Sequence, residues 1–181
     1  MHKFEEITTH TKEIFQGKII QLKVDNVTLP DGNTSKREII KHPGAVAIIA
    51  LTDEGNIVLV EQYRKALEKS LVEIPAGKLE EGEDPQTTAK RELEEETGYT
   101  TDNLQLINTF YTSPGFADEL VHLYFTDHLQ KMHSSPDGDE DEFVELMELS
   151  LKDCEQLEQQ QRIHDAKTSY ALLYLKLRGL K

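Results

Sequence analysis

Residues 77–99, GKLEEGEDPQTTAKRELEEETGY, hold a predicted helix behind a glycine-containing acidic loop. Asp84 followed by Pro85 is a typical helix N-cap and first-turn pair, and Gly98 is a typical C-terminal stop. Residues 86–97 between them are almost all helix formers. The sequence therefore predicts an acidic loop, one helix and a sharp helix end in this stretch.

The predicted helix carries three carboxylates on one face. Glu92, Glu95 and Glu96 lie close together there because residues three or four positions apart are neighbours on a helix. Ala89 and Leu93 form the neighbouring face, which we expect to pack on a sheet. A divalent cation would turn the repulsion among the carboxylates into ligation, since Mg2+ favours hard oxygen ligands. The alternative is a solvated acidic helix face, which is what most charge runs are.

The spacing of this stretch favours the metal over the solvated face. Gly77 is followed by five residues, Glu83, seven residues and then residues 91–99, RELEEETGY. This resembles the Nudix box, G-x5-E-x7-R-E-U-x-E-E-x-G-U, in which U is bulky and apolar. Every fixed position matches, and Tyr99 stands where an aliphatic residue is commoner. A 23-residue pattern of this kind is very unlikely to arise by chance.

The resemblance implies a Nudix fold, which is an α+β domain with a mixed sheet in an α/β/α sandwich. It also implies hydrolysis of a nucleoside diphosphate linked to another group, with Mg2+ or Mn2+ as cofactor. By the same resemblance, Glu92 and Glu96 are metal ligands, and the Ala76 carbonyl completes the metal shell. Glu95 would be a further ligand or a group that supports the ligands. Arg91 would orient a carboxylate, and Glu83 would support the loop–helix–loop.

Sequence outside the box resembles the ADP-ribose pyrophosphatase subgroup of the family. Pro114 lies sixteen residues after Gly98 in the stretch 112–119, TSPGFADE, and residues 61–64, EQYR, and 73–77, EIPAG, also match. This resemblance implies hydrolysis of ADP-ribose to AMP and ribose 5-phosphate. Taken alone, TSPGFADE is also typical of a plain turn between two strands. The open alternatives are another nucleotide sugar or dinucleotide as substrate, or a non-catalytic nucleotide-sensing domain.

The subgroup resemblance indicates which side chains bind the substrate: Arg37, Glu38, Arg64, Lys78, Ser113 and Glu119. Arg64 would contact the pyrophosphate, because a guanidinium fork suits phosphate oxygens. Arg37 and Glu38 would lie near the adenosine, across a homodimer interface formed by the N-terminal β-hairpin. Read without the family, Arg37 is an edge-strand charge.

An acidic loop, residues 137–142, DGDEDE, is expected to supply the general base. Attack of water on a phosphorus needs a carboxylate within hydrogen-bond reach of that water. Glu142 and Glu140 are the candidates, and Glu142 is favoured because it directly precedes an apolar strand. The alternative is a mobile solvated loop, and the two descriptions are compatible if the loop closes over the substrate.

Charge and composition limit the partners. The 181 residues include 20 Lys+Arg and 34 Asp+Glu, for a net charge of −14. Residues 77–99 and 137–148 hold most of that excess, so the acidity is concentrated at the predicted site, and it argues against a nucleic-acid binder. A single cysteine, Cys154, fits a cytoplasmic protein and is expected to be inert. The N-terminus resembles no secretory signal, and no apolar run suits a membrane span.

The rest of the chain predicts an α+β domain. Strands are predicted at residues 18–28, 37–42, 44–51, 57–63, 71–74, 104–111, 120–126 and 143–149, and further helices at 150–161 and 165–178. The last helix places Tyr170, Leu173 and Leu177 on one apolar face. Residues 1–43 would form an N-terminal β-hairpin region for dimerisation, and residues 44–181 the Nudix hydrolase domain.

Overall fold

The computed structural model describes residues 2–134 and 143–180, and the chain forms two compact units. The first unit comprises Met1–Gly44 and Phe110–Val121, and the second comprises Ala45–Thr109 and His122–Lys181. The first unit thus contains a second segment that lies far along the chain from the N-terminal residues. The division of the chain into domains at residues 43 and 44 stays a prediction.

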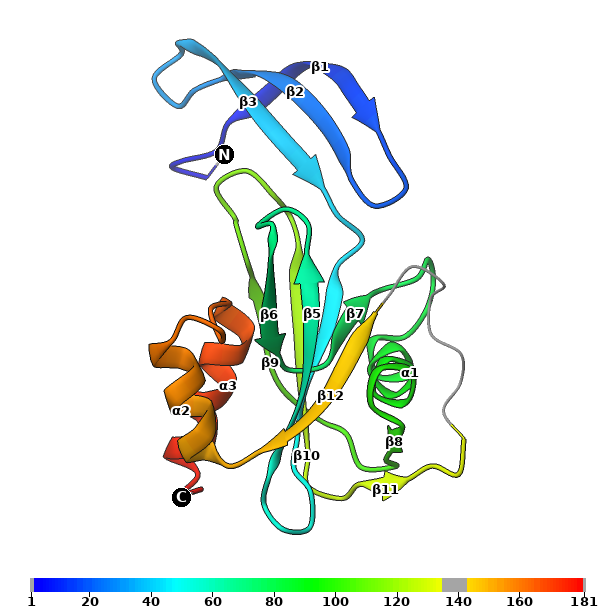
Figure 1. Cartoon of the computed structure of the whole chain (residues 1–181). Helices are drawn as coiled ribbons and strands as arrows, with labels where there is room; N and C mark the ends of the chain where they lie inside the picture. Colours follow the sequence, from blue (N-terminus) through cyan, green and yellow to red (C-terminus); the bar gives the residue numbers. More distant parts are fainter. Residues whose placement is uncertain (1, 135–142, 181) are drawn as a thin grey trace. The chain divides into compact units, whose positions relative to one another are not determined.

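The first unit is built on a three-stranded antiparallel sheet of β1 (Ile7–Gln16), β2 (Gln21–Thr28) and β3 (Thr34–Lys41), in the order β1-β2-β3 (Figure 1). Sequence patterns indicated β2 and β3 but missed β1. All ten residues of β1 are exposed, so it has no alternation of buried and exposed positions for a pattern to reveal. Backbone pairing with β2 forms this strand.

The second unit holds most of the remaining strands, which belong to separate sheets. One sheet has the order β7-β4-β10-β9 and another the order β12-β5-β6. Their bounds are β4 (Ala45–Ala50), β5 (Ile57–Arg64), β6 (Lys69–Glu73), β7 (Ala76–Lys78), β9 (Gln105–Tyr111), β10 (Leu120–Thr126) and β12 (Val144–Leu149). A short pair, β8 (Tyr99–Thr100) and β11 (Gln130–Lys131), follows the first helix.

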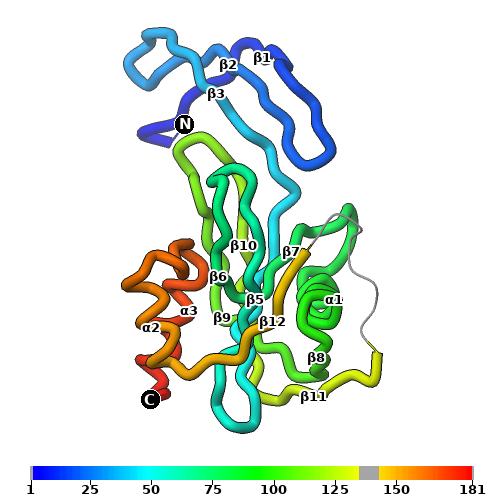
Figure 2. Tube along the Cα trace, in the orientation of Figure 1, coloured from blue at the N-terminus to red at the C-terminus, as the bar shows by residue number. Residues whose placement is uncertain are grey.

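Helices cover these strands on two sides. Helix α1 (Pro85–Thr97) lies on one side, and α2 (Leu151–Gln159) and α3 (Ala166–Leu177) lie on the other (Figures 1 and 2). The predicted α+β fold with an α/β/α sandwich is therefore confirmed. Within residues 2–134 and 143–180, no helix is long and apolar enough to cross a membrane.

The face of the last helix that the sequence indicated is not the face that packs in the structure, so that prediction is wrong. Tyr170, Leu173 and Leu177 on α3 are 37%, 59% and 89% exposed, whereas Leu172 and Leu175 are buried in the core. The helix is apolar on most sides, so the spacing of its residues does not select the face that packs. Packing against the strands makes that selection.

Candidate active site

Local interactions define both ends of helix α1. The Asp84 carboxylate accepts hydrogen bonds from the backbone N–H groups of Gln86, at 3.0 Å, and Thr87, at 3.4 Å. Gly98 ends the helix in the left-handed region, with φ 69°, and its N–H donates to the Glu94 carbonyl at 3.0 Å. These are the predicted cap residues, and they fix where α1 begins and ends.

The core then sets which way the helix faces. Ala89 and Leu93 are fully buried against β4 and β5, as predicted. The neighbouring positions Glu92 and Glu96 are carried to the edge of the core, where they are only 8% and 7% exposed. Burying carboxylates is costly unless charges or donors compensate them, so their surroundings are decisive.

The main chain at residues 76 and 77 contacts both buried carboxylates. The Ala76 N–H donates to Glu96 Oε2 at 3.0 Å, and a Cβ built at Gly77 would lie 1.8 Å from Glu92 Cδ. Only glycine leaves room for the Glu92 carboxylate here. Lys78 follows on β7 and is exposed. Sequence reasoning assigned Ala76 a role through its carbonyl and missed the contact of its amide with Glu96.

Arg91 supplies the compensating charge. Its Nη1 donates to Glu92 Oε1 and to Glu95 Oε2, each at 2.9 Å, and its Nη2 donates to Glu83 Oε2 at 3.3 Å. Burial of the guanidinium works to lower the pKa of Arg91, but Glu83, Glu92 and Glu95 outweigh it and raise that pKa. The Arg91 bond, with a further one from the Thr88 hydroxyl, lowers the pKa of Glu83. Arg91 therefore orients the carboxylates of Glu83, Glu92 and Glu95, and it favours the ionised form of Glu83.

These carboxylates have the chemistry that a hard divalent cation needs. Glu92, Glu95 and Glu96 offer oxygen ligands on one helix face, and the space beside Gly77 admits the Glu92 carboxylate without a clash. In the described part of the chain, no three His, Cys, Asp or Glu side chains converge on one point. Because Arg91 already holds Glu92 and Glu95, a cation would compete with the guanidinium for their oxygens.

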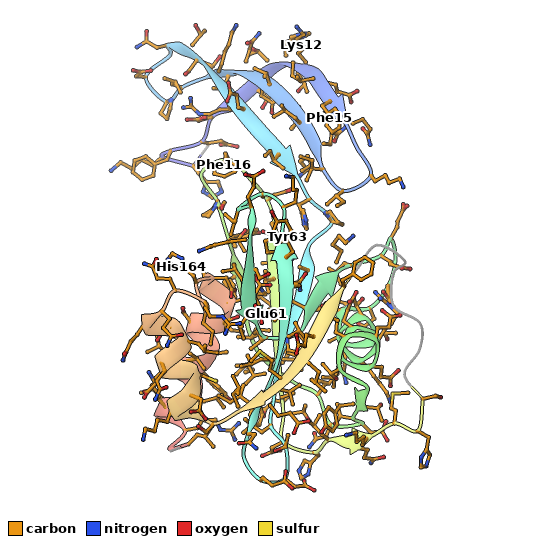
Figure 3. The ribbon with its side chains drawn as sticks, viewed as in Figure 1. Lys12, Phe15, Glu61, Tyr63, Phe116 and His164 are labelled. Atoms are coloured by element: carbon orange, nitrogen blue, oxygen red, sulfur yellow. The ribbon has the colours of Figure 1, made fainter. Side chains whose placement is uncertain are left out.

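A cavity of about 630 Å3 borders this helix face. Its lining comes from β5, β6, α1 and the start of β12: Glu61, Gln62, Tyr63, Ser70, Glu95, Glu96, Phe143, Val144 and Glu145. Glu61 and Tyr63 lie on β5 (Figure 3). Phe143 directly follows Glu142, which with Glu140 is a predicted general base, and both glutamates lie outside the described residues.

Arg64 lies at the end of β5, next to Tyr63 of the cavity. Its Nε donates to Glu73 Oε2 at 3.1 Å, and its Nη2 bonds the same oxygen. Burial works to lower the pKa of Arg64, but Glu73, Glu96 and Asp165 outweigh it and raise that pKa. A charged guanidinium is thus held beside the predicted metal helix.

Comparison with known proteins identifies this arrangement. The family model described as NUDIX domain matches residues 41–171. The chain belongs to the Nudix family. The family resemblance that residues 77–99 indicated is therefore confirmed, and α1 with its entry loop is the Nudix box.

Relatives agree with the family, and a solved structure shares the fold. An ADP-ribose pyrophosphatase of Bacillus subtilis (strain 168) is 56% identical, with 98% of this chain and 96% of that protein covered. A methanol dehydrogenase activator of Bacillus methanolicus is 58% identical, with 96% and 94% covered. A crystal structure of an ADP compounds hydrolase has a TM-score of 0.84 at 19% identity, covering 98% of this chain and 97% of that one. This last likeness shows that the Nudix fold is shared.

The first unit of this Nudix protein gathers other predicted substrate residues. Arg37 and Glu38 of β3 line a cavity of about 350 Å3 together with Ile39 and residues 114–118. Arg37 itself is paired with Glu6, through Nε at 2.8 Å and Nη2 at 2.6 Å. The sequence linked Arg37 to substrate or to an edge strand, and it did not reveal this partner.

Ser113 lies at the start of the turn that borders this cavity, and Glu119 directly precedes β10. The Ser113 carbonyl accepts from the N–H groups of Phe116, at 3.1 Å, and Ala117, at 2.9 Å. The Glu119 carboxylate accepts a hydrogen bond from the Thr112 hydroxyl. Backbone hydrogen bonds within the turn therefore stabilise residues 113–117.

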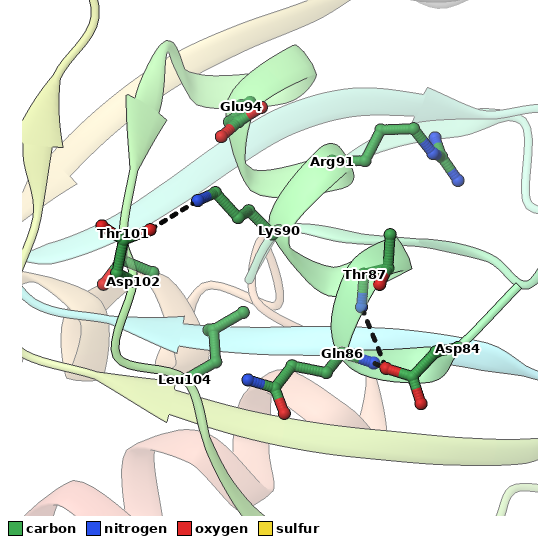
Figure 4. Close-up of a pocket in the computed structure, with 9 residues that line it drawn as sticks. All are labelled: Asp84, Gln86, Thr87, Lys90, Arg91, Glu94, Thr101, Asp102 and Leu104. Atoms are coloured by element: carbon green, nitrogen blue, oxygen red, sulfur yellow. Dashed lines mark hydrogen bonds and ion pairs between the residues drawn. The ribbon is translucent and has the colours of Figure 1, made fainter.

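A different cavity, of about 420 Å3, borders another side of the Nudix helix (Figure 4). It contains an ion pair between Lys90 Nζ and Asp102 Oδ1 at 2.7 Å, and the Arg91 side chain points away from that pair. Its lining includes none of Glu92, Glu95 and Glu96, so it does not serve the predicted metal site.

Tyr99 is the one loose match to the Nudix box, and it makes a contact that an aliphatic residue cannot make. Its hydroxyl donates to Glu148 Oε1 on β12 at 2.7 Å. This bond, followed by burial, raises the pKa of Tyr99 to about 12. Tyr99 therefore connects the end of the box to the strand that begins at the cavity.

Proposed function

We propose that this Nudix protein hydrolyses the pyrophosphate of ADP-ribose to AMP and ribose 5-phosphate, with Mg2+ or Mn2+ as cofactor. The observation that carries the proposal is that Glu95 and Glu96 of the box line a cavity of about 630 Å3. A relative named ADP-ribose pyrophosphatase, 56% identical over 98% of the chain, favours ADP-ribose among nucleoside diphosphate derivatives.

Four groups would hold the cation: the Ala76 carbonyl and the carboxylates of Glu92, Glu95 and Glu96. A divalent cation in this position supplies charge neutralisation for the pyrophosphate and lowers the pKa of water. The chain itself supplies orientation, because Arg91 bonds Glu92 and Glu95 at 2.9 Å and the Ala76 amide bonds Glu96 at 3.0 Å.

Positive charge for the pyrophosphate would come from Arg64, whose guanidinium is oriented by Glu73, and from the exposed Lys78. Arg37 and Glu38 are the proposed adenosine contacts, and Ser113 and Glu119 the proposed pocket residues of the first unit. A guanidinium bound to one carboxylate still has further N–H donors for phosphate oxygens, which suits Arg64 to this role.

We also propose that the protein is a cytoplasmic homodimer. Ile7, Ile14 and Phe15 on β1 are 42%, 48% and 54% exposed, which is unusual for large apolar side chains on one strand. We propose that the β1-β2-β3 sheet of a second copy of the chain covers these apolar side chains. Sedimentation equilibrium should give twice the chain mass, and a monomer at micromolar concentration would contradict the proposal.

A substrate panel tests the proposed reaction. With Mg2+ present, kcat/KM for ADP-ribose should exceed that for ADP-glucose, GDP-mannose and NADH by about tenfold or more, because a pocket that hydrogen-bonds one substrate rejects analogues. Phosphate release from the products by a coupled phosphatase gives the rates. Equal or higher efficiency on any of the other three would overturn the substrate, and no turnover of any of them would favour a nucleotide-sensing domain.

The general base can be located with two amide variants. Glu142→Gln should lower kcat by about a hundredfold to ten-thousandfold, which is the usual contribution of a positioned proton acceptor. Glu140→Gln has the same change in charge two residues away and serves as the matched control. If Glu142→Gln is nearly silent and Glu140→Gln is not, Glu140 is the base.

A further inference from the structure

Residues 73–77, which run from the end of β6 into β7, bear directly on the proposed metal ligands. Its Ala76 amide bonds Glu96, and the absence of a side chain at Gly77 leaves room for Glu92. A shift of this backbone would therefore alter the hydrogen bond to Glu96 and the space left for the Glu92 carboxylate. Whatever holds residues 73–75 in place also sets the geometry of the glutamates.

The start of helix α3 holds that segment from the other side of the strands. The Ile74 N–H donates to Thr168 Oγ1 at 3.0 Å, and both residues are fully buried. Ile74 and Pro75 connect β6 to β7. Because Pro75 has no N–H, Ile74 supplies the backbone donor of this connection, and it is buried. A buried N–H that loses its acceptor is costly, so this bond ties residue 74 firmly to α3.

A second contact joins the same two elements one residue earlier. Glu73 is 2% exposed, and its Oε2 lies 3.2 Å from Lys167 Nζ as well as bonding Arg64. Asp165 caps α3 by accepting from the N–H groups of Lys167, at 3.1 Å, and Thr168, at 3.2 Å. The two anchoring side chains are therefore themselves held at a capped helix start.

We propose that Thr168 and Lys167 are positioning residues for the reaction. Thr168 places the backbone that supports the Glu96 and Glu92 carboxylates, and Lys167 shares Glu73 with Arg64. The inference rests on the proposed metal-dependent hydrolysis and assigns part of its geometry to a helix outside the Nudix box. Hydrogen-bond partners behind metal ligands commonly change metal affinity or activity about 10- to 100-fold when they are removed.

The test compares Thr168→Val with Thr168→Ser in the full chain. Valine has the shape of threonine but no hydroxyl, whereas serine keeps the oxygen that accepts from Ile74. Mn2+ is titrated without substrate by electron paramagnetic resonance, and kcat and KM for ADP-ribose are measured separately. We expect Thr168→Val to weaken Mn2+ binding about tenfold and to lower kcat more than it raises KM. Thr168→Ser should stay within about twofold of the wild type on both readouts, which is well below the change expected when the bond is lost.

Thr101→Val separates positioning from general destabilisation. Thr101 is also buried, at 1% exposure, and its hydroxyl accepts a backbone hydrogen bond from Asn103 at 3.1 Å, away from the metal glutamates. The Thr101→Val variant should lower the free energy of unfolding measured in urea without changing Mn2+ affinity. If Thr168→Val matches Thr101→Val on every readout, or if Thr168→Ser loses Mn2+ as well, the inference is overturned.

Three further outcomes are distinguishable. If Thr168→Val does not fold, Lys167→Met takes its place, and wild-type Mn2+ affinity and kcat in that variant overturn the inference. If the wild type binds Mn2+ but does not cleave ADP-ribose, only the proposed substrate fails, because the affinity comparison still applies. A wild type that binds no Mn2+ overturns both the metal site and the role of α3.

Discussion

Glu96→Gln should lower the turnover of ADP-ribose by at least about a hundredfold, since a metal ion contributes several kcal/mol to the transition state and each 1.4 kcal/mol is tenfold in rate. The amide removes the charge of one proposed metal ligand. It keeps an oxygen that can accept from the Ala76 N–H, which the carboxylate bonds at 3.0 Å. The fold should therefore persist, and without metal it should be as stable as the wild type or slightly more stable.

Glu94→Gln is the matched control for this variant. Glu94 lies on the same helix, but its carboxylate accepts from the Thr100 hydroxyl at 2.5 Å and does not line the cavity of about 630 Å3 that Glu95 and Glu96 border. The control should keep turnover within about twofold, far from the loss expected for a ligand. Steady-state kcat with Mg2+ and thermal unfolding without it are the measurements. Wild-type turnover in Glu96→Gln would exclude the metal role of that residue.

Gly77→Ala should damage both stability and activity through one steric conflict. The added Cβ would lie 1.8 Å from Glu92 Cδ, and backbone strain is not the cause, because Gly77 has no positive φ. Overpacking of this kind costs about 1–3 kcal/mol of unfolding free energy. Since the Glu92 carboxylate must move, kcat should fall by about tenfold to a hundredfold.

A shorter acid at position 92 tests the cause. In Gly77→Ala with Glu92→Asp, the carboxylate is withdrawn by one methylene, so the clash is relieved while the metal ligand stays displaced. The double variant should regain unfolding free energy relative to Gly77→Ala without regaining kcat. Urea unfolding and kcat of the single and double variants complete the cycle. If Gly77→Ala alone keeps the wild-type unfolding free energy and the wild-type kcat, Glu92 does not require the space at Gly77.

Much of the fold follows from short stretches of sequence. Asp84 and Gly98 mark the ends of α1 through bonds to residues within four positions, so local spacing was enough to predict them. Strands β4 and β5 could be predicted because each contains a run of apolar residues, and the structure buries those runs. Strand β1 was missed because its residues are all exposed and only its pairing with β2 makes it a strand.

The sequence by itself determined the box helix, its glutamates and the family, since each depends on residues a few positions apart. Only the tertiary structure decided which face of α3 is buried, which residue pairs with Arg37 and what supports the glutamates. Thr168 and Ile74 are 94 positions apart, and no spacing rule connects residues so distant. Such contacts form only when burial of the core brings separate elements together and every buried donor must find an acceptor there.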